Sequence, residues 1–291
     1  MTVRQQVRTI LPQRMMPLAR RTYIGFGAAT SSLRLEPSFL VIGGQRCGTT
    51  SIFNALADHP QIVRPPVEKG TDYYTLHYVK GRAWYRGHFP VAAVARARMG
   101  GRPVAFEACT YYMFHPFALE RIAADFPNIK LVAMLRNPVE RAFSAYKHEF
   151  ARGFETEPDF MRALDLEDKR LEGEIDRMRA DVTYESHAHR HLAYKHRGQF
   201  AEQLERVFAL FPRERVHVME SEAFFDHPEK EYRELMRFLG LDTAAMPEFR
   251  QHNARPSSPM PAAAHALLER HFAPYDARLA ELLGRDAHWR R

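Results

Sequence analysis

Cysteine and long apolar runs are the two features that this sequence has least of. Only Cys47 and Cys109 occur among the 291 residues, so a disulfide framework is not implied and a reducing cytoplasm is the expected compartment. No apolar run approaches the ~20 residues that a membrane-spanning helix needs. The N-terminus carries no apolar stretch that ends in a small-residue cleavage site, so we expect no signal peptide.

Acidic residues are scarce at the start of the chain, where Glu36 is the only acid against six arginines in the first 38 residues. We expect residues 1–38 to form a basic N-terminal arm and residues 39–291 to form one domain. Because apolar side chains lie among the arginines, two interpretations stay open: a loosely docked leader, or a peripheral membrane contact of a cytoplasmic protein. The whole chain is also basic, with a formal charge of +7, which favours anionic ligands without choosing among them.

Short apolar runs alternate with helical patterns through the rest of the chain. With 45% hydrophobic residues, the chain can bury a sizeable core. The alternation predicts an α/β fold of the P-loop type, with three layers in which helices flank a central parallel sheet. The expected strands are 39–42, 104–106, 130–135 and 216–219, and the expected helices are 49–57, 117–126, 138–150, 200–211 and 230–239.

Residues 155–195 interrupt this alternation. The segment is rich in charge, poor in large apolar residues and without a strand signal. We therefore expect a charged insertion of helix and loop outside the core. A lid over a binding site and a merely solvated insertion are both open interpretations.

The strongest chemical signal is a glycine loop, residues 43–51, with the sequence Gly-Gly-Gln-Arg-Cys-Gly-Thr-Thr-Ser between a strand and a helix. Gly43 and Gly48 have the spacing of the phosphate-binding motif G-x-x-x-x-G-K-[ST], and Thr50 holds the place of its hydroxyl. Thr49, however, stands where that motif has lysine, so the loop is poorly equipped for γ-phosphoryl transfer. Arg46 is the nearest cation and can stabilise charge on a leaving phosphate oxygen.

A second motif follows the strand 130–135. Arg136 lies at the end of that strand, where open α/β sheets bind ligands, and Ser144 lies two turns into the next helix. Arginine with a hydroxyl is a natural pair for a second phosphate. The alternative for Arg136 and Arg141 is surface ion pairing with Glu140 or Glu149. Beside the glycine loop, ligand binding is the favoured interpretation.

Together these two segments resemble the 5′-phosphosulfate loop and the 3′-phosphate motif of sulfotransferases that use 3′-phosphoadenosine 5′-phosphosulfate (PAPS). The likeness is to the bacterial members and to the heparan sulfate N- and O-sulfotransferases, and it covers roughly residues 39–289. Four further segments fall in the family's order: 80–90, 107–112, 197–204 and 238–241.

The resemblance implies transfer of a sulfuryl group from PAPS to a hydroxyl or amine of a glycan, lipid or small metabolite, without a metal and without a nucleic-acid partner. Arg46 takes the place of the family's catalytic lysine, Arg136 and Ser144 match the 3′-phosphate pair, and the rest of the glycine loop matches the phosphosulfate site. The loop residues expected to bind the donor beside Arg46 are Cys47, Gly48, Thr49, Thr50 and Ser51. A nucleotide-dependent kinase on a P-loop scaffold and a non-catalytic anion-binding module remain the alternatives.

Sulfuryl transfer also needs a base that takes the proton of the acceptor. In the glycan-directed relatives a glutamate precedes two aromatics by three residues, but here that spacing lands on Gly70. We expect Glu68 to be the base, with Asp72, Glu107 and His148 as open alternatives, and Lys69 to help orient the donor sulfate or the acceptor.

A group of aromatic residues and a group of histidines near these motifs each have a structural and a functional interpretation. A cluster of aromatics is more often core than an acceptor cleft, and alternating histidines without a carboxylate partner are more often a solvated loop than a metal site. We therefore expect core and solvated loop respectively. The residues concerned are Tyr73, Tyr74, Trp84 and Tyr85 for the core, and His187, His189 and His191 for the loop.

Overall fold

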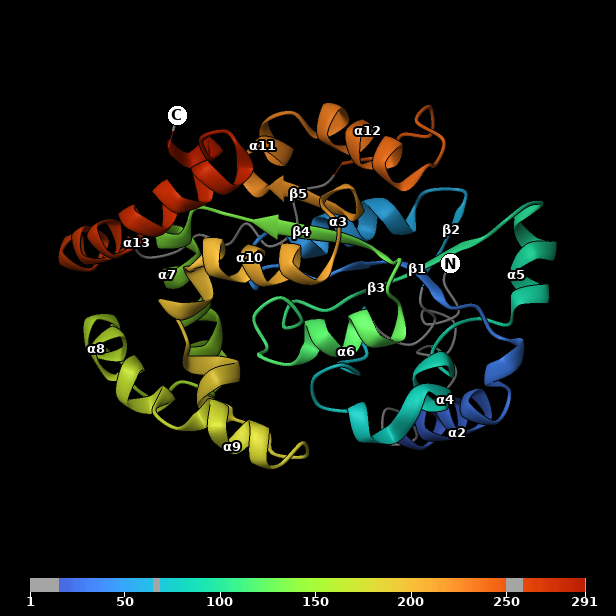
Figure 1. Ribbon diagram of the computed structural model, residues 1–291, viewed down its shortest axis with the longest axis horizontal. Helices are drawn as coiled ribbons and strands as arrows, with labels where there is room; N and C mark the ends of the chain where they lie inside the picture. The colour runs from blue at the N-terminus through green and yellow to red at the C-terminus, as the bar shows by residue number, and fades with distance from the viewer. Residues whose placement is uncertain (1–15, 65–68, 250–258, 291) are drawn as a thin grey trace.

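The computed structural model describes residues 16–64, 69–249 and 259–290, and its centre is a five-stranded parallel sheet (Figure 1). The strands lie in the order β2-β3-β1-β4-β5, and every neighbouring pair is parallel. Their bounds are Pro37–Val41 for β1, Ile62–Val63 for β2, Val104–Ala108 for β3, Lys130–Leu135 for β4 and Val216–Glu220 for β5. The predicted parallel α/β fold is confirmed.

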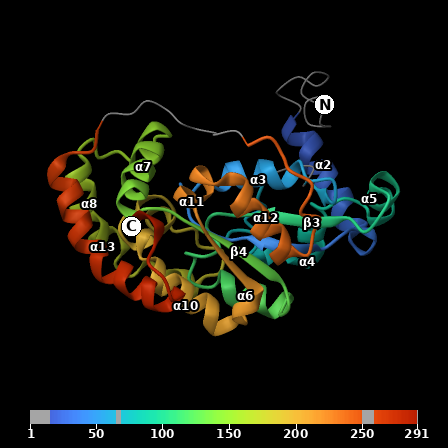
Figure 2. The same cartoon turned by 90° about the horizontal axis from the view of Figure 1, so that it is seen from above.

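Helices cover both faces of this sheet. Figures 1 and 2 show α3, α11 and α12 on one face and α6 and α10 on the other. The bounds are Met16–Ala29 for α2, Thr49–Ala57 for α3, Gly81–Arg86 for α4, Ala92–Met99 for α5, Ala118–Asp125 for α6, Pro138–Ala151 for α7, Phe160–Leu171 for α8, Glu174–Ala180 for α9, Phe200–Leu210 for α10, Ser221–Asp226 for α11, Pro228–Leu239 for α12 and Ala262–Leu283 for α13. None of the described helices is both long and apolar enough to cross a bilayer.

The central strands form because their sequences are apolar at almost every position. In β4 all residues but Lys130 are buried, since helices cover the sheet from both sides. Asn137 then starts α7: its side chain accepts the N–H groups of Val139 and Glu140, and Pro138 occupies the first turn. Each strand followed by a capped helix delivers a loop to the carboxyl edge of the sheet, where the candidate site lies.

The insertion 155–195 is helical, as expected, and packs on the domain through a second hydrophobic core that it shares with α7 and α13. It contains α8, α9 and a π-helical turn at Ala188–Leu192, which lies against α7 and α8. Glu167 of α8 is fully buried and accepts the backbone N–H groups of Lys195 and His196. The apolar residues of this core include Phe143, Phe160, Leu164, Leu192, Tyr194, Leu268 and Phe272.

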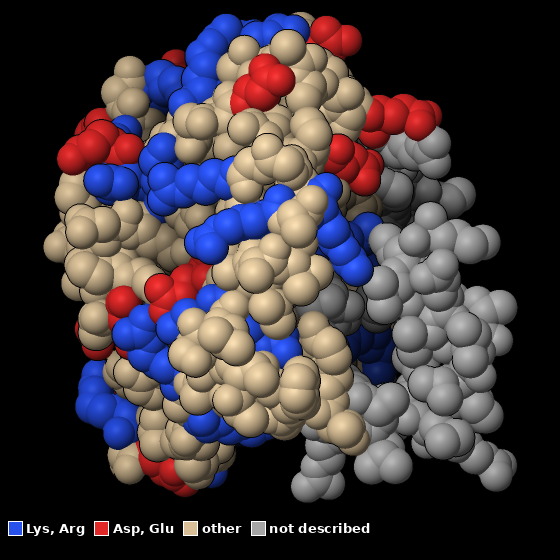
Figure 3. Space-filling model, turned by 90° about the vertical axis from the view of Figure 1, so that its right-hand side faces the viewer, with Lys and Arg blue, Asp and Glu red and all other residues tan. Residues whose placement is uncertain are grey.

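The opposite end of the molecule, around α2, α4 and α5, is basic and partly apolar at its surface. Helix α2 lies against α4 so closely that a Cβ atom at Gly27 would come within 2.3 Å of the Gly87 carbonyl oxygen. Lys and Arg side chains are spread across this face (Figure 3), and exposed arginines follow one another in and after α5. Phe26 and Leu33 are 64% and 61% exposed there. The remainder of the predicted basic arm, residues 1–15, lies outside the described residues.

Candidate functional site

The glycine loop curls tightly against the end of β4. A Cβ atom at Gly43 would lie 2.7 Å from the Met134 amide nitrogen, and one at Gly44 would lie 2.8 Å from the Met134 carbonyl oxygen. Arg46 and Gly48 both have positive φ angles, of 67° and 75°. This curvature brings Gly48 to the start of α3, where the first amide groups of a helix have no intrahelical partner. The loop can therefore present N–H groups to an anion.

The second motif lies directly beside the loop. Arg46 donates from Nε to Ser144 Oγ over 3.0 Å, and Arg136 donates from Nη1 to the Arg46 carbonyl oxygen over 3.2 Å. Arg136 follows the last residue of β4, and Ser144 lies in α7. The structure thus brings together residues of both sequence motifs that are about 90 positions apart in the chain.

A lysine from a separate segment completes the cationic side of the loop. Lys69 donates from Nζ to Thr49 Oγ1 over 2.9 Å and lies 3.4 Å from Thr50 Oγ1. Burial lowers the pKa of Lys69 to about 8. Because Thr49 stands where the phosphate-binding motif has lysine, Lys69 brings an amine from outside the loop to that position.

Cys47 and Ser51 contribute to the loop through its backbone. The Cys47 side chain is fully buried, and burial raises the pKa of its thiol to about 12, so it remains protonated. Its N–H donates to the Gly44 carbonyl oxygen over 3.2 Å, which closes the turn. Ser51 is buried as well, and its N–H donates to the Gly48 carbonyl oxygen. Thr50, in contrast, is exposed.

Several buried polar atoms around the loop have no hydrogen-bond partner among the described residues. Ser221 Oγ is buried without a hydrogen-bond partner among the described residues, and a Cβ atom at Gly48 would come within 3.1 Å of it. Arg141 is fully buried: Nη2 donates to the Tyr194 carbonyl oxygen, while Nε and Nη1 have no partner in the described part of the chain. The alternative that Arg141 forms a surface ion pair is therefore wrong. Such a surplus of donors fits a ligand with several anionic oxygens.

A buried relay links the glycine loop to the insertion. Gln45 donates to Glu149 over 2.6 Å and accepts from Arg197 over 2.6 Å, while His191 of the π-helical turn pairs with Glu149 over 2.9 Å. Burial alone would raise the pKa of Glu149, but the hydrogen bond and charge of His191 outweigh it and lower that pKa. The sequence offered no signal for this relay, since its members are dispersed over 150 positions.

The candidate bases occupy different environments. Glu68, the base expected from the sequence, lies outside the described residues and stays a prediction. Glu107 is fully buried and accepts from the Thr71 N–H over 2.5 Å, from Tyr85 over 2.8 Å and from Tyr112 over 2.9 Å. Burial raises its pKa. With no exposed oxygen, Glu107 positions the segment around Thr71 and does not face a substrate.

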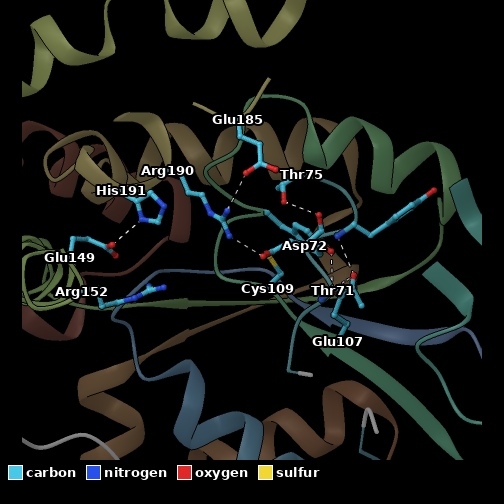
Figure 4. Close-up of polar contacts among 12 residues, drawn as sticks. Thr71, Asp72, Thr75, Glu107, Cys109, Glu149, Arg152, Glu185, Arg190 and His191 are labelled. Carbon is cyan, nitrogen blue, oxygen red and sulfur yellow. Dashed lines mark hydrogen bonds and ion pairs between the residues drawn. The ribbon is translucent and has the colours of Figure 1, made fainter. Parts of the chain in front are cut away.

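Asp72 and His148 are the accessible alternatives. His148 is half-buried in α7 and lies 3.5 Å from Arg152. Asp72 has a φ angle of 53° and a side chain that is 33% exposed. Its carboxylate accepts from Cys109 Sγ over 3.0 Å and pairs with Arg190 Nη2 over 3.1 Å (Figure 4). Of the two, Asp72 is the one close in sequence to Lys69, whose amine contacts the loop threonines.

The aromatic cluster is core, as expected. Tyr73 stacks on Tyr85 with ring centroids 4.6 Å apart, and both are buried together with Tyr74. His187 is exposed as expected, but the expected solvated loop is wrong for His189. His189 is buried, with Nδ1 2.7 Å from the Tyr111 hydroxyl, because the π-helical turn packs against α7 and α8. Within the described ranges, no group of His, Cys, Asp and Glu is arranged to hold a metal ion.

Comparison with known proteins identifies the family. The Sulfotransferase domain family matches residues 36–257. The chain belongs to the sulfotransferase family. The solved structure of a sulfotransferase from Alicyclobacillus acidocaldarius superposes with a TM-score of 0.66 at 30% identity, over 88% of this chain and 100% of that one.

Curated sulfotransferases match over part of their length. The membrane-associated sulfotransferase kil1 of Dictyostelium discoideum is 24% identical over 87% of this chain, which spans 66% of that protein. The human bifunctional heparan sulfate N-deacetylase/N-sulfotransferase 2 is 33% identical over 40% of this chain, which corresponds to 13% of that protein. The chain therefore spans about two thirds or less of the curated relatives named here.

Proposed function

We propose that this sulfotransferase-family chain transfers a sulfuryl group from PAPS to a hydroxyl or amine of an acceptor. The observation that carries the proposal is the meeting of Arg46, Ser144 and Arg136 at a glycine loop whose lysine position is Thr49. The loop keeps the geometry for binding a phosphate while lacking the lysine that serves γ-phosphoryl transfer. No metal is required for the proposed reaction.

The proposed donor contacts follow the two motifs. The amides from Gly48 onward and the hydroxyls of Thr49 and Thr50 hold the phosphosulfate end, and Arg136 and Ser144 hold the 3′-phosphate. Phe225 lies beside Gly48 and is 37% exposed, so its ring offers a face to the adenine base. The donor supplies a sulfuryl group whose bond to a phosphate oxygen breaks as the acceptor attacks. Arg46 and Lys69 stabilise the negative charge that this cleavage leaves on the phosphate oxygen.

Binding of 3′-phosphoadenosine 5′-phosphate, the product of the donor, tests this arrangement. We expect calorimetric titration to show binding that does not depend on magnesium and that is tighter than binding of ATP. Arg136→Ala and Ser144→Ala should each weaken it by about 10-fold or more, since each removes a hydrogen bond to a charged phosphate, worth about 1.5–3 kcal/mol.

Arg162→Ala is the matched control, because Arg162 is 70% exposed in α8 and lies in neither motif. It should leave the affinity unchanged. A magnesium-dependent preference for ATP would overturn the sulfotransferase proposal in favour of the kinase alternative.

We further propose that the basic end of the molecule contacts an anionic membrane surface. The first 106 residues hold 15 of the 42 Lys and Arg residues but only 4 of the 35 acids. Exposed Phe26 and Leu33 lie among these charges, a combination that suits a lipid interface better than a purely polar anion. The name of the Dictyostelium relative, which calls that protein membrane-associated, supports the same proposal. A membrane-peripheral location follows from it, and the low cysteine content supports the cytoplasmic side of the membrane.

Vesicle binding tests the contact. We expect the full chain to sediment with vesicles that contain phosphatidylserine, and Phe26→Ser combined with Leu33→Ser to lower the partition coefficient by about 10-fold or more, because two large apolar side chains lose their burial in lipid. Leu210→Ser is the control, since Leu210 is 40% exposed on α10 at another face. Equal partition of the double variant and the unaltered chain would refute this contact.

A further inference from the structure

We infer that Asp72 takes the proton of the acceptor, and that Arg190 of the insertion covers Asp72 until an acceptor binds. This inference rests on the proposed sulfuryl transfer. It assigns the base from the contacts of the described residues, and it gives the insertion a part in the reaction. Figure 4 shows the two side chains facing each other, Asp72 from the segment before α4 and Arg190 from the π-helical turn.

The chain around Asp72 is fixed relative to the glycine loop. Lys69 accepts from the Ala108 N–H at the end of β3 over 2.9 Å, and its Nζ contacts Thr49 in the loop. Three residues span at most roughly 11 Å, so Asp72 lies within that reach of Lys69 along the backbone. A Cβ atom at Gly70 would come within 2.6 Å of the Ala108 carbonyl oxygen, so no acid fits at that position.

Asp72 itself is held in an unusual backbone conformation. Its carbonyl oxygen accepts the N–H groups of Leu76 and His77 over 2.9 Å and 3.2 Å, and Glu107 anchors the preceding Thr71 through two hydrogen bonds. Aspartate is one of the few residues that tolerate a φ angle of 53°. These hydrogen bonds therefore fix the backbone of Asp72. A fixed backbone suits a side chain that must contact a substrate in a defined geometry.

The two carboxylate oxygens of Asp72 have different partners. Oδ1 accepts from Cys109, which is buried, and burial together with the charge of Asp72 keeps the pKa of that thiol well above its ordinary value. The thiol thus stays a donor. Oδ2 faces Arg190, whose side chain is 31% exposed. Only the contact with Arg190 can be released to solvent or substrate, and its release frees one oxygen to accept a proton.

Arg190 has a second acidic partner. Its Nη1 lies 3.7 Å from Glu185 Oε2 in the same insertion, so the guanidinium keeps a negatively charged neighbour when it leaves Asp72 (Figure 4). The neighbouring residues are anchored, His189 on Tyr111 and His191 on Glu149. The backbone of the turn is fixed, and the Arg190 side chain lies between two acidic partners, so in the proposed gate it moves from Asp72 to Glu185.

In the reaction, the acceptor oxygen or nitrogen forms a bond to sulfur and gives its proton to Asp72 Oδ2. The bond between sulfur and the donor phosphate oxygen breaks, and its electron pair stays on that oxygen beside Arg46. With Arg190 in place, Oδ2 is engaged in the ion pair, so water reacts slowly with the bound donor. The gate therefore limits loss of the sulfuryl group to water.

Hydrolysis of PAPS by the full-length chain tests both parts, with water as the acceptor probe. Arg190→Gln should raise the rate of sulfate release about 10-fold, and Glu185→Gln should lower it, because Arg190 then keeps only Asp72 as a partner. Adding Asp72→Asn to Arg190→Gln should lower the rate about 100-fold below that of Arg190→Gln, to about one tenth of the unaltered rate, consistent with loss of general-base catalysis.

Three comparisons keep the test decisive. Arg190→Lys retains the charge and should return hydrolysis toward the unaltered rate, and Arg179→Gln, in an exposed ion pair of α9, should leave it unchanged. Affinity for 3′-phosphoadenosine 5′-phosphate should be the same in all variants, which shows that they fold. No gain in Arg190→Gln would overturn the gate, and a gain that survives Asp72→Asn would overturn the base. Absence of nucleotide binding in the unaltered chain would instead refute the proposed function.

Discussion

Arg46→Ala is expected to lower kcat by about 100-fold or more while changing the affinity for 3′-phosphoadenosine 5′-phosphate much less. Arg46 lies at the turn of the glycine loop, and its guanidinium reaches Ser144 of the second motif. Because the glycine loop is proposed to hold the phosphosulfate end of the donor, the charge of Arg46 lies near the oxygen that becomes negative as the sulfuryl group leaves. An interaction that strengthens as the bond breaks affects kcat more than binding.

Arg46→Lys is the control for the charge. Both lysine and alanine carry a Cβ atom and must adopt the φ angle of 67°, so backbone strain is common to the two variants. Lysine is also the residue that the resemblance places here in the family. We expect Arg46→Lys to retain most of the turnover that Arg46→Ala loses, as measured by steady-state kinetics with a fixed acceptor. Unchanged turnover in Arg46→Ala, with unchanged donor affinity, would show that Arg46 has no role in the reaction.

The sheet and its main helices could be predicted because their signals are local. The strands β1, β3, β4 and β5 each contain a short run of mainly apolar residues, and the helices after β1 and β4 begin at positions that the sequence marks. Strand β2 was missed because it has only two residues, Ile62 and Val63, too few to show a period. Helix α13 was missed as well, and Pro274 lies within it.

The contacts of the site were harder to predict because they join distant segments. The glycine loop and the second motif were identified, but the sequence does not show that Lys69 reaches Thr49 or that Arg190 reaches Asp72, a residue 118 positions away. The histidine alternation was misjudged for the same reason. Burial of His189 depends on the packing of the insertion, which no local pattern reports.

Charge on Lys69 gives donor binding a specific dependence on pH. Burial lowers the pKa of Lys69 to about 8 in the free protein. Below pH 8 the side chain is protonated and attracts the phosphosulfate end of the donor. Above pH 8 it is neutral, so binding must also recruit a proton. The affinity for 3′-phosphoadenosine 5′-phosphate should therefore be constant between pH 7 and 8 and fall above that, approaching 10-fold per pH unit, or about 100-fold by pH 10.

Lys69→Arg separates this effect from other titrations, because arginine stays charged through the whole range. Its affinity should be nearly flat from pH 7 to 10, while Lys69→Met should bind weakly and without a slope at every pH. The phosphates of the ligand lose their last protons near pH 6, so they do not contribute in this window. A slope that persists in Lys69→Arg would mean that another group titrates. A flat profile for the unaltered chain would show that the Lys69 amine does not contact the donor. If it did, the affinity would fall as the amine loses its charge.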